Sequence, residues 1–186
     1  MTVATRTAKT PHASWWSVDR WTWVQAVALL AAFAAAVALR VTIGGVGVAQ
    51  SAPAGWVFAG CLVALALATG TSSPVGWGSL TAGLGVGALL CVPVGIGQLL
   101  THRPLHDAAG FWSWALVVTV VATAEELFLR GALYDVIHKV AGTATAVVVG
   151  PGALALLHVP LYGWHVLPLD LAVGVVLGGL RAQTGT

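Results

Sequence analysis

Apolar and polar residues alternate in long blocks along this chain of 186 residues, and the apolar blocks have lengths typical of membrane helices. A helix that crosses the hydrocarbon core of a bilayer needs roughly 20 apolar residues. The pattern therefore predicts an all-α fold, a polytopic transmembrane bundle of about six helices. We expect these helices at residues 21–41, 54–70, 76–100, 111–137, 143–158 and 166–180.

The predicted helices divide the chain into three parts. Residues 1–20 are polar and form an N-terminal tail, residues 21–109 hold the first three helices, and residues 110–186 hold the last three. Several tryptophans lie between residues 15 and 23, and indole rings prefer the headgroup level of a bilayer. The first apolar run lacks a clear cleavage site, so we expect an uncleaved membrane helix rather than a signal peptide.

Composition excludes an ordinary soluble domain. The chain is 58% hydrophobic and 8% charged, whereas a soluble domain carries about a quarter charged residues. The net charge of +2 is too small to indicate binding to nucleic acid. Cys61 and Cys91 lie in apolar runs and are interpreted as packing residues, not as a disulfide or a metal site. We therefore expect membrane lipids, and no nucleic acid, around this protein.

The positions of lysine and arginine predict the orientation, because cytoplasmic loops carry an excess of both. With the N-terminus inside, six helices assign five cations to the inner face and two to the outer face. The inner five are Arg6, Lys9, Arg20, Lys139 and Arg181, and the outer two are Arg40 and Arg103. We expect a multi-pass membrane protein with both termini in the cytoplasm.

Three ionisable residues interrupt the fourth apolar segment: Glu125, Glu126 and Arg130. A charge at mid-membrane costs about 2.5 to 3.5 kcal/mol, so such residues indicate function. Glu126 precedes Arg130 by four positions, the favoured orientation for an ion pair on a helix. Glu125 points about 100° away around the helix. It is therefore the glutamate available as a general base that takes a proton from water.

His158 ends the next apolar segment, which a short link joins to the fourth. Neighbouring helices joined in this way pack antiparallel, so His158 and Glu125 are expected at similar depth, facing one cavity. A carboxylate and an imidazole there can activate water and stabilise an oxyanion. In the alternative interpretation the helix leaves the bilayer at Glu125, and the charges and His158 are interfacial. Spacing leaves both interpretations open.

The stretch from Ala124 to Leu133 resembles the first motif of the CPBP family, Glu-Glu-x-x-x-Arg. This family comprises CAAX prenyl proteases and bacteriocin-processing or bacteriocin-immunity membrane proteins, and is also called Abi. Its second motif, Phe-x-x-x-His, corresponds here to Leu154 through His158, with leucine for phenylalanine. The stretch from Asp170 to Arg181 is similar to the family's next helix. The resemblance covers residues 110–186.

The resemblance implies an intramembrane endopeptidase that cleaves a peptide or protein substrate, in a bacterial cell membrane. Glu125 would activate the water, Glu126 and Arg130 would support it, and His158 would position the water or stabilise the oxyanion. The family is described both as metalloprotease and as metal-free. The cofactor is therefore either a divalent metal such as zinc, held by Glu125 and His158, or none.

The resemblance is partial. The family's third motif, a histidine followed four residues later by Asn or Asp, comes after a Thr-Gly turn, and this sequence stops at Thr184-Gly185-Thr186. We therefore expect a member truncated before that motif, since His165 lies too early to replace it. This leaves open a catalytically impaired member that acts as a membrane scaffold, an immunity protein or a partner-binding protein. The oligomeric state, a homo-oligomer included, is also open.

Other membrane functions fit less well. Zinc proteases of the His-Glu-x-x-His type and rhomboids with a Gly-x-Ser nucleophile lack their motifs here. An aspartyl protease would pair Asp135 with a Gly-x-Gly-Asp, but Asp170 follows Leu-Pro-Leu and is interpreted as an interfacial or packing acid. A proton-coupled transporter that uses the glutamates would be expected to show an inverted repeat or a pair of broken helices in matching halves. The sequence shows neither pattern.

Overall fold

The computed structural model describes residues 19–70, 96, 100 and 111–184, and these residues form helices without any strand. The predicted tail, the third predicted helix, Cys91 and Arg103 lie outside this part, apart from a few of their residues. The α-helices are α1 (Arg20–Gly44), α2 (Ala52–Ala68), α4 (Phe111–Glu126), α5 (Tyr134–Tyr162) and α6 (Leu167–Thr184). A π-helical stretch, Leu127–Leu133, joins α4 to α5, and short 3-10 turns at Gly45–Gly47 and Trp164–Val166 precede α2 and α6.

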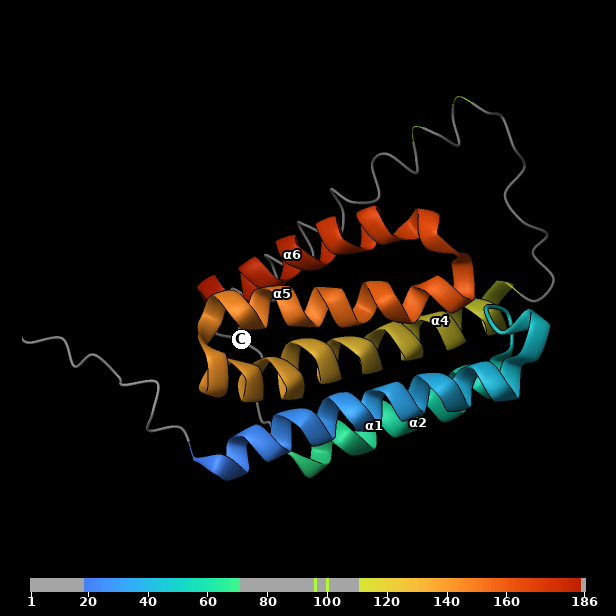
Figure 1. The fold of residues 1–186 in the computed structure, drawn as a ribbon. Helices are drawn as coiled ribbons and strands as arrows, with labels where there is room; N and C mark the ends of the chain where they lie inside the picture. The colour runs from blue at the N-terminus through green and yellow to red at the C-terminus, as the bar shows by residue number, and fades with distance from the viewer. Residues whose placement is uncertain (1–18, 71–95, 97–99, 101–110, 185–186) are drawn as a thin grey trace, which may run out of the picture.

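The helices lie side by side in one bundle (Figure 1). Helices α1 and α2 run antiparallel along one side. Helix α4 packs against α2, α5 packs against α1, and α6 packs against α5. The N-cap of α2 explains where the chain reverses after α1. Gly45 ends α1 with a positive φ of 56°, and the Ser51 hydroxyl then accepts a hydrogen bond from the Ala54 N–H at 3.4 Å.

A continuous helical run from Phe111 to Tyr162 replaces the two separate segments that the sequence predicts there. The run reverses direction at Gly142, whose φ of 81° is accessible to glycine at little cost. After this reversal α5 returns antiparallel to α4 (Figure 1), so Gly150 lies beside the backbone of Leu129. The antiparallel pairing is therefore made by one residue rather than by a polar loop.

The membrane character of the chain is confirmed, while the helix count differs from the prediction. Within the described residues, three helical stretches are long and apolar enough to cross a bilayer: Arg20–Gly47, Trp112–Tyr162 and Trp164–Gln183. The middle stretch contains two predicted helices, because the Gly142 reversal leaves no break in the helical run. Helix α2 is apolar but has 17 residues. The protein is thus an all-α integral membrane protein.

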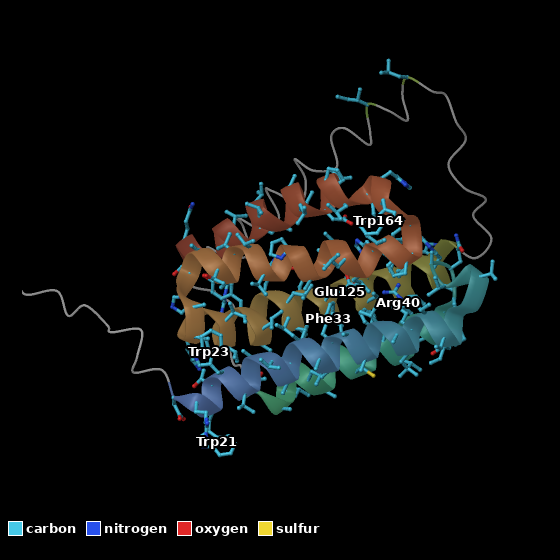
Figure 2. The ribbon with its side chains drawn as sticks, viewed as in Figure 1. Trp21, Trp23, Phe33, Arg40, Glu125 and Trp164 are labelled. Carbon is cyan, nitrogen blue, oxygen red and sulfur yellow. The ribbon has the colours of Figure 1, made fainter. Side chains whose placement is uncertain are left out.

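Tryptophans mark both ends of the bundle. Trp21 and Trp23 are exposed at the start of α1, and Trp164 is exposed at the opposite end (Figure 2). This placement matches the two headgroup levels of a bilayer. Between them, many leucine and valine side chains face outward from the helices, a surface suited to lipid rather than to water.

Aromatic rings and small residues hold the interior together. Phe33 of α1 stacks on Phe128 of the π-helical stretch with ring centroids 5.4 Å apart, and it tilts against Phe58 of α2 at 6.4 Å. Gly55 of α2 and Gly174 of α6 let neighbouring helices approach closely. A Cβ at either glycine would lie within 3 Å of a neighbouring side chain. This packing fixes the depth at which the charged residues of α1, α4 and α5 meet.

Candidate active site

Glu125 lies in the last turn of α4, on the side that faces the interior of the bundle. Its exposed fraction is 8%, and the buried Val121, Ala124 and Phe128 surround it in sequence. The π-helical stretch begins two residues later. Such stretches are rare and occur frequently at functional sites, because they change which side chains a helix turns inward. Glu125 is therefore held in the core at an irregular point of the helix.

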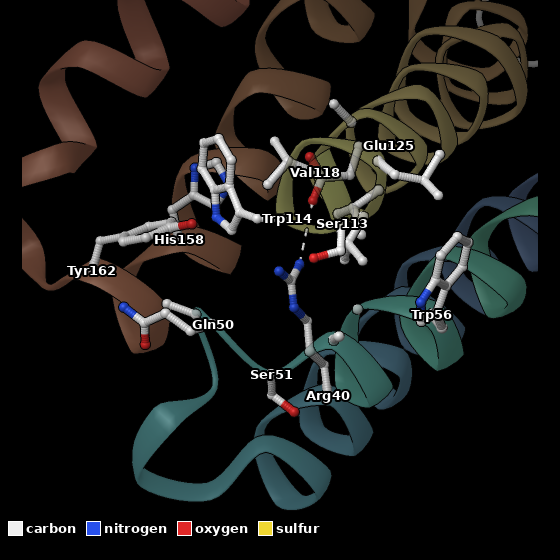
Figure 3. A pocket seen from close by; sticks show the side chains of 17 residues that line it. Arg40, Gln50, Ser51, Trp56, Ser113, Trp114, Val118, Glu125, His158 and Tyr162 are labelled. Atoms are coloured by element: carbon white, nitrogen blue, oxygen red, sulfur yellow. Dashed lines mark ion pairs between the residues drawn. The ribbon is translucent and has the colours of Figure 1, made fainter. Parts of the chain in front are cut away.

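Arg40 of α1 is the ionic partner of Glu125. The Arg40 Nη1 atom lies 3.5 Å from the Glu125 Oε1 atom, and Arg40 is only 6% exposed (Figure 3). Its guanidinium also lies 4.8 Å from the centroid of the Phe58 ring, a cation–π contact. The assignment of Arg40 to the outer face was wrong, because α1 continues to Gly44 and turns this side chain inward. A lone arginine late in an apolar run is the signal that could have identified it.

Glu126 and Arg130 form the ion pair expected from their four-residue spacing. The Glu126 side chain is 50% exposed, and the Arg130 side chain is mostly buried. Neither lines the cavity that Glu125 faces. The two adjacent glutamates thus point to different surroundings, and each has an arginine of its own.

His158 lies near the end of α5 and is oriented by a carboxylate from α6. Its Nδ1 atom is 2.8 Å from the Oδ2 atom of Asp170, and its ring meets the edge of Tyr162 at a centroid distance of 5.4 Å. The sequence interpretation treated Asp170 as an interfacial or packing residue and missed this contact. Its signal was an acid at the start of the next predicted helix, where two antiparallel helices bring it back to the level of His158.

Glu125, Arg40 and His158 line one cavity of about 510 Å³ (Figure 3). The cavity lies between α1, α2, α4 and α5, and it also reaches Ser51 and Gln50 in the connection between α1 and α2. The structure therefore brings together Glu125 and His158 among the four predicted site residues. It adds Arg40 and leaves Glu126 and Arg130 beside the cavity.

The described residues do not fit a zinc site. A catalytic zinc ion takes three protein ligands. Within the described part of the chain no three His, Cys, Asp or Glu side chains come together as ligands, so Glu125 and His158 would supply only two. The guanidinium of Arg40, 3.5 Å from Glu125, would in addition repel a divalent cation bound there.

Comparisons with known proteins identify the part of the chain that holds most of this site. No curated protein and no solved structure matches the chain. Residues 107–186 match the family model described as type II CAAX prenyl endopeptidase Rce1-like. The match includes Glu125, Glu126, Arg130 and His158, whereas Arg40 lies outside it. The match over residues 107–186 makes this part of the chain similar to that family and is consistent with a CPBP-family membrane protein.

Proposed function

We propose that this chain is an intramembrane endopeptidase of the CAAX prenyl protease type, which cleaves a peptide bond near the membrane with water activated by Glu125. One observation carries the proposal. Glu125 and His158, from different helices of the family-matched region, line the same cavity. A carboxylate and an imidazole beside a cavity of this size are suited to acid–base catalysis on a peptide segment.

The proposed reaction is hydrolysis by general base catalysis. Glu125 takes a proton from a water molecule while the water oxygen adds to the carbonyl carbon of the scissile bond. The carbonyl oxygen becomes an oxyanion. When the C–N bond breaks, the proton held by Glu125 passes to the leaving nitrogen, so the products are a carboxylic acid and an amine and the base is restored.

His158 would assist from the opposite wall of the cavity. Asp170 lies 2.8 Å from Nδ1, and a carboxylate at this distance favours the tautomer with hydrogen on Nδ1. The Nε2 atom is then free of hydrogen and can accept a hydrogen bond from the attacking water. In this assignment Asp170 is a positioning residue that acts through His158.

The Glu126–Arg130 pair would support the base without contacting the substrate. It lies beside the π-helical stretch, directly after Glu125, and its two partners are one helical turn apart. We assign it the role of holding this turn, and with it the direction of the Glu125 side chain.

Cleavage of reporter peptides in proteoliposomes tests the proposal. The panel contains fluorogenic peptides with and without a prenylated cysteine, since the family name indicates prenylated substrates. We expect Glu125→Gln to reduce kcat/KM by at least about 1,000-fold, because the amide cannot take up the proton of water. Asp135→Asn is the matched control. Asp135 forms an ion pair with Arg181 at a distance of 2.8 Å, and neither residue lines the cavity, so this variant should cleave the peptides as the parent does.

The proposal fails if the Glu125→Gln protein, folded and reconstituted to the same level, cleaves at the parental rate. It also fails if no peptide of the panel is cleaved by the parent while a partner protein or ligand binds at the cavity instead.

A further inference from the structure

Arg40 is an isolated cation in an otherwise apolar helix. Helix α1 begins with Arg20, and Arg40 is the only other charged residue in this helix. The side chain is 94% buried, and it reaches from α1 toward α4, where it meets Glu125 (Figure 3). A buried charge inside a membrane helix is expensive and is retained chiefly for function. The question is therefore what Arg40 does for Glu125.

The two arginines of the site are divided between the two glutamates. Arg130 is engaged by Glu126 on the same helix, outside the cavity. Glu125 has its cation from α1 instead. The carboxylate that faces the cavity thus has its ion-pair partner on a helix that lies outside the family-matched residues.

The Arg40–Glu125 ion pair is longer than a direct charge-assisted hydrogen bond. The separation of 3.5 Å exceeds the roughly 2.7 to 2.9 Å of a charge-assisted hydrogen bond. Among the described residues, Glu125 Oε1 and Arg40 Nε and Nη1 are buried without a hydrogen-bond partner. The guanidinium of Arg40 also lies over the face of the Phe58 ring. Charge therefore orients the carboxylate while its oxygen stays available to a water molecule.

We propose that Arg40 is a positioning residue for the catalytic base, an inference that rests on the proposed function. It keeps Glu125 in its ionised form and directs it into the cavity, from a helix that the family match does not include. Glu125 in an apolar interior without this cation would favour the neutral acid, which cannot accept a proton from water.

The first test measures the pair itself and does not depend on activity. Thermal unfolding in detergent is recorded for Arg40→Gln, Glu125→Gln and the double variant. Each single change leaves one charge buried without its partner, so we expect each to lower Tm by about 5 °C or more. The double variant should lose no more than the worse single one, because neither charge remains.

The second test measures cleavage of the reporter peptide. Arg40→Gln should reduce kcat/KM by at least about 100-fold, the scale of a lost electrostatic contact in a catalytic site. Arg40→Lys keeps the charge but loses the planar guanidinium that lies over the Phe58 ring, so it should recover only part of the activity lost in Arg40→Gln. Millimolar guanidinium should restore part of the activity of Arg40→Ala, since the free ion can occupy the vacated space beside Glu125.

Arg181 provides the matched control. Its side chain is about as buried as that of Arg40, and it pairs with Asp135 outside the cavity. Arg181→Gln should lower Tm while the folded protein keeps its kcat/KM, and guanidinium should not raise it.

The outcomes separate the two proposals. Additive losses of Tm in the double variant overturn the Arg40–Glu125 pair, whatever the activity. Coupled losses, with parental cleavage by Arg40→Gln and none by Glu125→Gln, overturn the positioning role and leave the proposed function standing. Parental cleavage by Glu125→Gln overturns the proposed function, and the positioning role with it.

Discussion

The two adjacent glutamates of this site have different surroundings. Glu125 and Glu126 are chemically identical, yet one is buried at a cavity beside Arg40 and the other is half exposed beside Arg130. The difference follows from helical rotation of about 100° between neighbours, which turns only one of them toward α1. Assigning a role to a residue here therefore requires its surroundings as well as its type.

Asp170 allows a test at the same scale. We expect Asp170→Asn to reduce kcat/KM by about 10- to 100-fold, because the amide no longer fixes the tautomer and ring direction of His158. The loss should appear in kcat rather than in KM, since Asp170 does not line the cavity. Steady-state kinetics in proteoliposomes provide the measurement.

A double variant distinguishes this role from a general loss of packing. If Asp170 acts through His158, then His158→Gln with Asp170→Asn should be no slower than His158→Gln alone. Multiplied losses in the double variant would contradict the assignment.

At the scale of the helices, the contact between α5 and α6 affects the site through Asp170. This residue of α6 supplies the carboxylate that orients His158 on α5. The helices can approach this closely because Gly174 has no Cβ. A Cβ there would lie 2.6 Å from the Cβ of Pro151. Small residues at helix contacts serve this purpose in membranes, where association relies on packing.

Enlarging Gly174 should separate these two helices. We expect Gly174→Ala to destabilise the protein by about 1 to 3 kcal/mol, the usual cost of overpacking. Cleavage should fall as well, since Asp170 lies one helical turn away. Gly179→Ala on the same helix is the control, because its added Cβ would meet nothing within 4 Å among the described residues. Equal Tm values for the two variants would contradict this account.

At the scale of the whole molecule, positive charge distinguishes the two ends of the bundle. Arg20, Lys139 and Arg181 belong to the end where α1 begins and α6 finishes (Figure 1). Apart from the buried Arg40, the described residues at the other end contain no lysine or arginine. On this asymmetry we propose that the N-terminus is cytoplasmic. The cavity reaches Gln50 and Ser51 at the opposite end, so we propose that it opens toward the outer face.

Cysteine labelling tests this orientation in intact bacterial cells. In a background with Cys61→Ala and Cys91→Ala, exposed positions at the two ends are replaced one at a time, Val46→Cys and Lys139→Cys. A membrane-impermeant maleimide should label Val46→Cys in intact cells and Lys139→Cys only after lysis. The reverse pattern would place the N-terminus and the positive end outside.

The sequence by itself determined the membrane class, the α-helical fold, the family resemblance and the charged residues of the fourth segment. These follow from composition and from spacing along one helix, both of which are local properties. The spacing of Glu126 and Arg130 specifies an ion pair wherever the segment is helical. The count of separate helices was not reproduced, because one glycine reversed the chain at residue 142 without a polar loop.

Only the tertiary structure decided which residues complete the site. Arg40 and Asp170 come from other helices than their partners, and no periodicity in α1 or α6 relates them to Glu125 or His158. Their depth and rotation depend on how closely the helices approach, which glycines and aromatic rings of several helices determine jointly. Packing between helices depends on which residues of different helices are in contact, and a single sequence does not specify those contacts.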